Sequence, residues 1–153
     1  MFITPVTLLC VGKIKTSWIA EGCAEYAGRV RTLEVREVPA GKQTDAAKQR
    51  AEEGEKLLAA AEKLRGELWT LDETGKTMTS RQFADFLGKA ADRGTPLTFV
   101  LGGAYGLSDE VKKAARGSVR LSDMTFPHEL CRLVFLEQLY RAQEIRKGTG
   151  YHH

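Results

Sequence analysis

The sequence predicts an α/β fold in which a mostly parallel β-sheet carries helices on both faces. Strand-like and helix-like segments alternate along the chain, which favours this class. The apolar run PLTFVLGG, residues 96–103, is typical of a parallel strand buried on both faces. A chain of 153 residues with 42% hydrophobic and 28% charged residues suits one soluble domain. We therefore expect a single domain spanning residues 1–153.

Short apolar or alternating segments predict the strands. LEVREVPAG alternates apolar and charged residues and breaks at Pro39, which is typical of a half-exposed or edge strand. GKT at Gly75 to Thr77 is expected to be a turn, because Thr70 stands where a Walker A loop needs glycine. The predicted strands are residues 6–12, 33–41, 67–73, 96–103 and 118–124.

Apolar residues at helical spacing, together with boundary residues, predict the helices. Ser17 is a candidate N-cap, Gly66 is a natural stop, and Pro127 suits a first helical turn. The last helix has an apolar surface wider than one stripe, explained by burial in a single core or by a self-association face. The predicted helices are residues 17–30, 44–66, 80–94, 108–117 and 126–148.

Composition and the N-terminal segment exclude several classes of protein. The apolar segment 1–10 lacks a charged start and a cleavage site and is too short to span a membrane, so we expect a cytoplasmic protein without a membrane contact. Cys10, Cys23 and Cys131 are widely separated, which argues against a disulfide framework or a thiolate zinc site, and we expect no metal. A net charge of +3 permits nucleic-acid binding without demanding it.

The stretch GGAYGLSDE, directly after the predicted buried strand, is a candidate ligand site. Open α/β sheets bind ligands at the carboxyl edge, where Gly102 and Gly103 leave backbone N–H groups free. Asp109 and Glu110 begin the next helix and would repel a phosphate, so a ligand such as an adenine ring fits better. A tight turn that only packs strand on helix is the alternative. The loop 121–126 follows another strand and is expected beside it.

Two further features leave alternatives open. A dinucleotide site is a second interpretation of the glycine loop, because Asp123 lies about twenty residues beyond the glycines, but the spacing is GGxxG rather than GxGxxG. His128 is either a catalytic base or a structural residue in a first helical turn. The tail GTGYHH is either a disordered terminus or a functional strip.

Several motifs extend over the whole chain in a characteristic order. They are VGK, EVPAGK, EGEKLL, TLDETGK, FVLGGAYGLS, LS-x-MTFPHEL-x-R, EQLYRA and the terminal GYHH. In this order they resemble the ribosomal RNA large subunit methyltransferase H family of the SPOUT superfamily. The resemblance implies a SPOUT-type fold with a C-terminal trefoil knot, a homodimer and S-adenosylmethionine as cofactor. It also implies methylation of N3 of a pseudouridine, with 23S rRNA or the ribosome as partner.

The same resemblance assigns site residues. Tyr151 and His152 are expected over the target base, Tyr151 stacking or hydrogen-bonding and His152 contacting RNA or taking the N3 proton. Arg132 and Arg141 are expected at RNA phosphates or at the dimer interface, with a helix-face salt bridge as the alternative. Tyr105 lies where the family varies and is given no required role. The expected cofactor residues are Leu71, Gly102, Gly103, Leu121, Ser122, Asp123, Met124, Thr125 and Phe126.

Two other classes remain open at this point. A nicotinamide-dependent oxidoreductase would use the glycine loop as a dinucleotide site. A non-catalytic RNA-binding module would use only the basic residues near the C-terminus.

Overall fold

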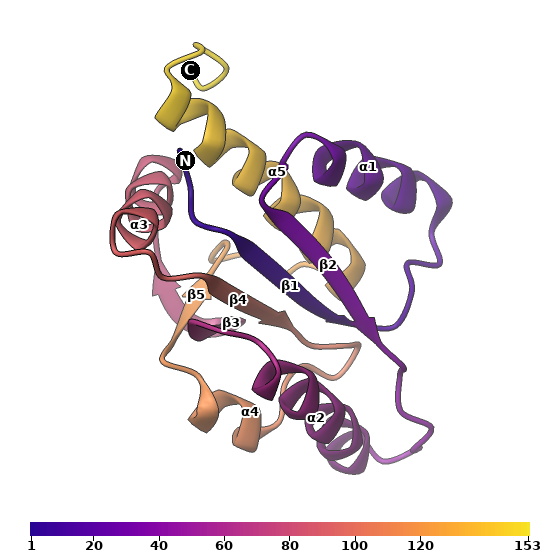
Figure 1. The fold of residues 1–153 in the computed structure, drawn as a ribbon. Helices are drawn as coiled ribbons and strands as arrows, with labels where there is room; N and C mark the ends of the chain where they lie inside the picture. Colours follow the sequence, from indigo (N-terminus) through magenta and orange to yellow (C-terminus); the bar gives the residue numbers. More distant parts are fainter.

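The computed structural model describes all 153 residues and confirms the alternation of strands and helices (Figure 1). The five strands form one sheet with the order β2-β1-β4-β3-β5, and every neighbouring pair is parallel. The elements are β1 (Val6–Val11), α1 (Ser17–Gly28), β2 (Leu33–Val38), α2 (Ala46–Glu62), β3 (Glu67–Thr77), α3 (Ser80–Asp92), β4 (Leu97–Leu101), α4 (Asp109–Ala114), β5 (Gly117–Arg120) and α5 (His128–Lys147).

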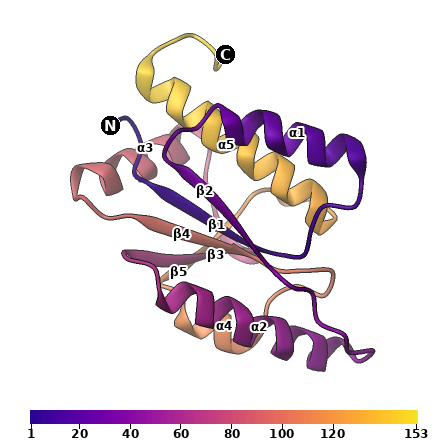
Figure 2. The same cartoon turned by 45° about the vertical axis from the view of Figure 1, so that its right-hand side comes forward.

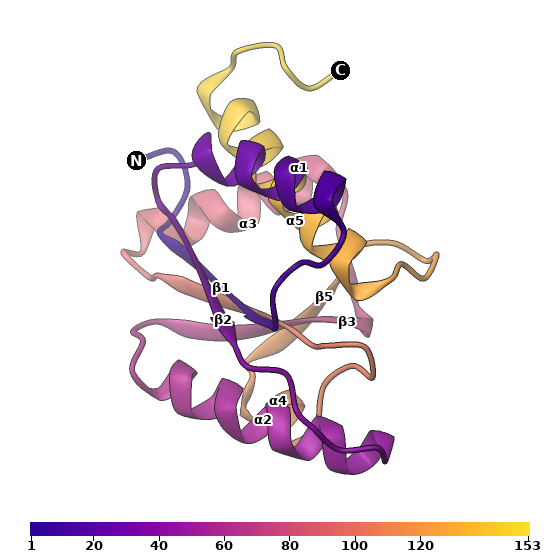
Figure 3. The ribbon, with the colours of Figure 1, turned by 90° about the vertical axis from the view of Figure 1, so that its right-hand side faces the viewer.

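Helices cover both faces of the sheet, as predicted. Helices α1, α3 and α5 lie on one face, and α2 and α4 lie on the other (Figures 2 and 3). The central strands therefore bury both sets of side chains. In β1, Leu8 and Cys10 join the core beneath α1, α3 and α5, whereas Leu9 and Val11 join the core beneath α2 and α4. All of β4 is buried, which confirms the expectation for the apolar run.

The two ends of the sheet differ from the centre. Strand β2 is an edge strand with a partly exposed surface, as its alternating pattern predicts. The turn expected at Gly75 to Thr77 is wrong, because this segment continues β3, where Lys76 and Thr77 pair with β5 after a register shift. A Cβ at Gly75 would lie 2.7 Å from the backbone of Val119, so this close pairing requires glycine.

Helix boundaries shift slightly from the expected positions. Thr16, not Ser17, is the N-cap of α1, and its side chain makes no capping hydrogen bond. Helix α2 ends at Glu62, before Gly66, whose backbone adopts a φ of +92° in the connection to β3. Pro127 is the N-cap of α5 and lies just outside the first turn. These shifts leave the order of the elements unchanged.

The wide apolar surface of α5 is explained by burial. The helix packs against both α1 and α3 above the sheet. Phe135, Leu136, Leu139 and Ala142 are almost completely buried there. None of the helices is both long enough and apolar enough to cross a membrane. The knot that the resemblance implies stays a prediction.

Candidate functional site

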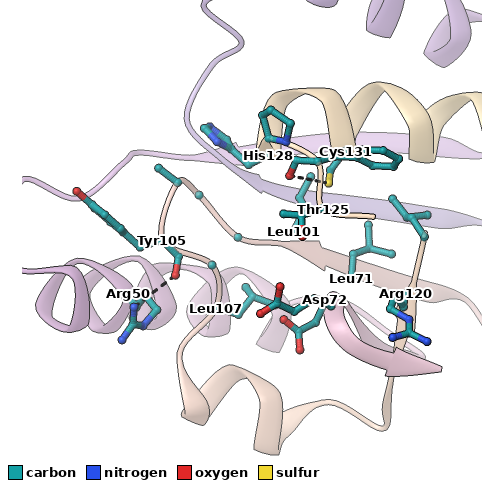
Figure 4. Close-up of a pocket in the computed structure, with 18 of the residues that line it drawn as sticks. Arg50, Leu71, Asp72, Leu101, Tyr105, Leu107, Arg120, Thr125, His128 and Cys131 are labelled. Atoms are coloured by element: carbon teal, nitrogen blue, oxygen red, sulfur yellow. Dashed lines mark hydrogen bonds between the residues drawn. The ribbon is translucent and has the colours of Figure 1, made fainter. Parts of the chain in front are cut away.

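A cavity of about 840 Å³ lies at the carboxyl edge of the sheet, where the loops after β4 and β5 meet the irregular middle of β3 (Figure 4). This volume is within the usual range for small-molecule and cofactor sites. The loops 101–107 and 120–127 both line it, which confirms that the glycine loop and the loop 121–126 lie side by side. The remaining lining residues are Leu71, Asp72 and Glu73 within β3, Arg50 on α2, Asp109 and Lys112 on α4, and His128 and Cys131 on α5.

The glycine loop folds back on itself at the cavity wall. The Gly106 N–H donates to the Gly103 carbonyl over 3.1 Å, and Gly106 has a φ of +81°. A Cβ at Gly102 would lie 2.5 Å from the Gly106 carbonyl carbon, and one at Gly103 would lie 2.9 Å from the buried Glu53 carboxylate. The glycines therefore permit a close approach that side chains would prevent.

Backbone N–H groups at the cavity are available to a ligand. In the segment 102–107, Gly103 and Gly106 pair with each other as an isolated antiparallel bridge, and the other N–H groups donate to no protein acceptor. In the segment 121–126, only the Met124 N–H does so, to the Ser122 Oγ over 3.0 Å. The other loop N–H groups need partners, and the polar edge of a bound molecule can satisfy them.

Charged side chains around the cavity are of both signs and partly neutralise each other. Asp72 follows Leu71 at the end of the paired part of β3 and lies 3.7 Å from the Lys112 Nζ. Arg120 pairs with Asp123 at 3.0 Å. Asp109 lines the cavity at the start of α4. This mixture does not suit a polyphosphate, which requires an excess of cations or a free helix N-terminus.

The structure brings together all the expected cofactor residues except one. Asp123 does not line the cavity, and its side chain is largely exposed in the pair with Arg120. The lining residues from the expected set are Leu71, Gly102, Gly103, Leu121, Ser122, Met124, Thr125 and Phe126.

Sequence reasoning missed several residues of the wall. Asp72 could have been found, because it directly follows an expected residue at a strand end. Arg50 and Cys131 could not have been found, because they reach the cavity from α2 and α5. No local sequence pattern shows where these helices lie relative to the cavity. Arg50 donates to the Tyr105 carbonyl over 3.5 Å, and the Cys131 thiol contacts the Phe126 carbonyl over 3.7 Å (Figure 4).

The C-terminal tail lies beyond the other end of α5 and makes specific contacts. The Tyr151 hydroxyl donates to the Glu137 Oε1 over 3.1 Å, and its ring packs edge-on against Tyr140 at 4.8 Å between centroids. The Arg141 Nη1 lies 3.1 Å from the His152 Nδ1. The tail therefore folds back on the second half of α5 rather than extending into solvent.

The tail side chains have shifted ionisation. Burial, followed by hydrogen bonds with Tyr26 and Glu137, raises the pKa of Tyr151 to about 12. Tyr151 therefore stays protonated near neutral pH. Partial burial, followed by the positive charges of Arg81 and Arg141, lowers the pKa of His152. The neutral imidazole is thus favoured.

The two arginines of α5 that are candidate RNA contacts have different surroundings. Arg132 is only 4% exposed, and its guanidinium pairs with Glu37 at 2.5 Å and donates to the Gly12 carbonyl over 2.8 Å. Arg141 pairs with Glu137 at 2.5 Å on the same helix. Arg141 therefore makes the helix-face ion pair considered as the alternative, whereas Arg132 pairs with edge strand β2 instead, and the contacts of both with RNA stay predictions.

Solved structures show with which known proteins this chain shares its fold. TrmJ from Z. mobilis ZM4 superposes with a TM-score of 0.55 and 12% identity, over 92% of this chain and 70% of that one. The SpoU methyltransferase AviRb from Streptomyces viridochromogenes has a TM-score of 0.50 and 15% identity, over 94% and 60% of the two chains. The predicted SPOUT-type α/β fold is confirmed.

Sequence comparisons identify the family to which the chain is similar. A profile of the family described as "Predicted SPOUT methyltransferase" matches residues 4–152. A protein named ribosomal RNA large subunit methyltransferase H from Geobacter sp. (strain M21) is 45% identical over 150 residues, or 95% of this chain and 97% of that protein. Its namesake from Lactococcus lactis subsp. cremoris (strain SK11) is 42% identical over 159 residues, covering 96% and 98%.

The chain belongs to the SPOUT methyltransferases and, within them, to the ribosomal RNA large subunit methyltransferase H family. The protein is therefore a methyltransferase, as the resemblance predicted. This membership supports neither the oxidoreductase nor the non-catalytic RNA-binding module.

Proposed function

We propose that this enzyme transfers a methyl group from S-adenosylmethionine to N3 of a pseudouridine in 23S rRNA, free or within the ribosome. One observation carries the proposal: the chain has the three-loop cavity and is 45% identical, over nearly its full length, to a protein named ribosomal RNA large subunit methyltransferase H. Methyl transfer to rRNA also agrees with the mild positive charge of the chain.

The residues of the cavity fit the proposed cofactor. S-adenosylmethionine, when bound, supplies a methyl group already activated by a positively charged sulfur. Leu71, Leu121 and Phe126 provide apolar surface for an adenine ring, and the free N–H groups of the two loops can bind its polar edge. The Asp72 carboxylate favours a positive charge nearby. No part of this ligand requires a phosphate site.

The enzyme's main task is then to position the acceptor nitrogen against the methyl group. In-line transfer requires the acceptor nitrogen about 3 Å from the methyl carbon, and holding this geometry can supply much of the rate acceleration. The N3 proton must also leave. Tyr151 is poorly suited to accept it or to act as a phenolate, because its pKa is raised to about 12.

The C-terminus lies away from the edge of the sheet that carries the cavity (Figure 3). His128 lines the cavity at the start of α5, whereas the tail contacts Glu137 and Arg141, which lie about 14 and 20 Å further along the helix at 1.5 Å per residue. A base held at the cavity is thus more than two helix turns from the docked tail of the same chain. We infer that the enzyme is a homodimer in which the tail of one protomer lies over the cavity of its partner. Trp18 on α1, which is 62% exposed, is a candidate contact between the protomers.

We also propose a cytoplasmic location and a reaction that uses no metal ion. The enzyme would act in the cytoplasm, where its rRNA substrate is made and assembled. Catalysis by positioning and electrostatics requires no metal, and the structure brings no three His, Cys, Asp or Glu side chains together as a metal ion would need.

The proposal is tested by single-turnover methylation of 23S rRNA with S-adenosylmethionine carrying a labelled methyl group, followed by mass spectrometry of the modified nucleoside. We expect one methyl group on N3 of a pseudouridine. Label found on another nucleoside, or on none, would refute the proposed substrate. Calorimetry should show binding of S-adenosylmethionine and none of NAD.

The shared site is tested by mixing two impaired variants, at a concentration of S-adenosylmethionine well below the Kd of Gly102→Ala. Gly102→Ala alters the cavity and leaves the tail intact, whereas a Tyr151→Phe, His152→Ala double variant alters only the tail. If the tail of one protomer serves the cavity of its partner, mixed dimers contain one intact site and regain activity. Mixtures as inactive as the separate variants would refute the shared arrangement without affecting the proposed reaction.

A further inference from the structure

The contacts of Arg141 determine which nitrogen of His152 can carry a proton. The Arg141 Nε and Nη2 both donate to the Glu137 carboxylate, over 3.3 and 2.5 Å. The remaining Nη1 lies 3.1 Å from the His152 Nδ1. A guanidinium group has only donors and does not deprotonate in proteins, so the Nδ1 must be the acceptor in this contact. An acceptor nitrogen carries no hydrogen, and the single hydrogen of the neutral ring is then on Nε2.

We propose that Arg141 is a positioning residue that holds His152 as the Nε2–H tautomer, so that His152 donates a hydrogen bond to a carbonyl oxygen of the target base instead of accepting its N3 proton. This inference rests on the proposed methylation of a uracil-type base. It separates the two roles that the sequence left open for His152, contact with RNA and removal of the proton.

The surroundings of His152 favour this state. Arg141 of α5, Arg81 of α3 and the neighbouring His153 disfavour a second proton on the ring, whereas Glu137 favours one. Glu137 is already engaged by Arg141 and by the Tyr151 hydroxyl. The guanidinium of Arg141 also lies over the Tyr151 ring at 5.0 Å, which restricts the plane in which it can donate. The Arg141 guanidinium is therefore held by three partners, Glu137, Tyr151 and His152.

A donor at this position assists the reaction in a defined way. N3 of a uracil-type base lies between two carbonyl groups, and negative charge spreads onto their oxygens as the N3 proton passes to water. The nitrogen electron pair then forms the bond to the methyl carbon, while the electron pair of the broken carbon–sulfur bond stays on sulfur. The His152 Nε2–H stabilises the charge on one carbonyl oxygen and retains its own hydrogen throughout.

Nuclear magnetic resonance reads the tautomer directly. In protein labelled with ¹⁵N-histidine, signals of His152 are identified by their loss in His152→Gln. At neutral pH we expect an unprotonated Nδ1 and a protonated Nε2. A ring with its hydrogen on Nδ1 would overturn the proposal. The spectrum reports the tautomer whether or not the protein methylates RNA, so failure of this inference and failure of the proposed function are separate results.

Two substitutions separate a donor from a base. Glutamine at position 152 retains an N–H donor near the place of Nε2 but cannot accept a proton, whereas alanine retains neither. We expect single-turnover methylation to fall about 100-fold in His152→Ala, the usual loss for one donor to a developing oxyanion, and by less than about tenfold in His152→Gln. Equal losses in the two variants would overturn the donor role and indicate that His152 accepts the proton.

The role of Arg141 is tested by a second matched pair. Arg141→Met removes the donor to Nδ1, and we expect His152 to show a mixture of tautomers and a higher pKa. Arg141→Lys retains a cation that can donate to Nδ1, and we expect it to restore most of the wild-type histidine spectrum and methylation rate. A histidine spectrum unchanged in Arg141→Met would overturn the positioning role, because a purely structural effect on α5 would not move the tautomer.

Discussion

Helix α5 joins two functional regions that are held in place by different kinds of interaction. At its start, His128 and Cys131 enter the cavity wall, and the neighbouring Arg132 is buried in an ion pair with the sheet edge. Along its second half, the tail docks through partly buried polar contacts with Glu137 and Arg141. Buried packing and backbone geometry hold the first region, whereas a few partly buried polar contacts hold the second more weakly and depend on pH and salt.

This difference agrees with the roles proposed for the two regions, cofactor binding at the cavity and contact with RNA at the tail. A cofactor site gains affinity when its loops are formed in advance, because little ordering then has to occur on binding. A tail that must admit and release a large RNA gains from weaker contacts. We therefore expect substitutions at the cavity end to act on stability and cofactor affinity, and those at the tail end to act on the reaction and its pH dependence.

The largest effect is expected for Arg132→Met, which leaves the Glu37 carboxylate without its buried partner. Glu37 is 35% exposed, so water offsets part of the loss, and we expect the free energy of unfolding to fall by about 3 kcal/mol, the low end for a broken buried pair. Urea unfolding measures this change. Arg36→Met, which breaks an exposed pair with Glu34 on the same strand, is the control and should cost under about 1 kcal/mol. Equal stability of the two variants would show that Arg132 does not anchor α5.

A substitution at the glycine loop should act on cofactor affinity more than on folding. The Cβ of Gly102→Ala would lie 2.5 Å from the Gly106 carbonyl carbon, so the loop must move. We expect the Kd for S-adenosylmethionine, measured by calorimetry, to rise roughly 100-fold, as for other misplacements of about 1 Å. Gly28→Ala is the control, because its Cβ meets no atom within 4 Å. Unchanged affinity in Gly102→Ala would remove the loop from the cofactor site.

A smaller effect is expected on the alkylation rates of two cysteines, which report whether a ligand occupies the cavity. Cys131 lines the cavity, whereas Cys23 lies outside it and lines a separate hollow beside α1. Burial raises the pKa of both thiols, so alkylation of each should be slow. S-adenosylmethionine at ten times its Kd should slow the alkylation of Cys131 roughly tenfold and leave Cys23 unaffected. Protection of Cys23 alone would place the ligand elsewhere. Mass spectrometry of the peptides measures both rates.

The smallest effect concerns docking of the tail as pH falls. The pKa of His152 is lowered in the folded state, so the neutral ring that accepts from Arg141 is complete above the usual histidine pKa and is lost as pH falls through the lowered value. After correction for the slower intrinsic exchange at acid pH, we expect weaker protection of the amides of residues 149–153. His152→Gln should remove this pH dependence. If the dependence persists in that variant, another group controls the tail.

Local patterns predicted most of the fold but not every boundary. The alternation in residues 33–38 predicted an edge strand, and the apolar run before Gly102 predicted a strand buried on both faces, because each depends on periodicity within a few residues. The turn expected at Gly75 to Thr77 was wrong because this segment is held in β3 by pairing with β5, which lies more than forty residues further along the chain. Such tertiary pairing overrides local turn signals.

By itself, the sequence determined the order of strands and helices, the three loops expected at one edge of the sheet, and the family, because these depend on short motifs and their spacing. Only the tertiary structure decided that Cys131 enters the cavity wall, that Arg132 is buried against Glu37, 95 residues away, and that the tail folds back on the second half of α5. These contacts depend on strand order and on the direction in which α5 crosses the sheet. Neither the strand order nor the direction of α5 can be derived from periodicity along the chain, because both arise only when distant segments pack together.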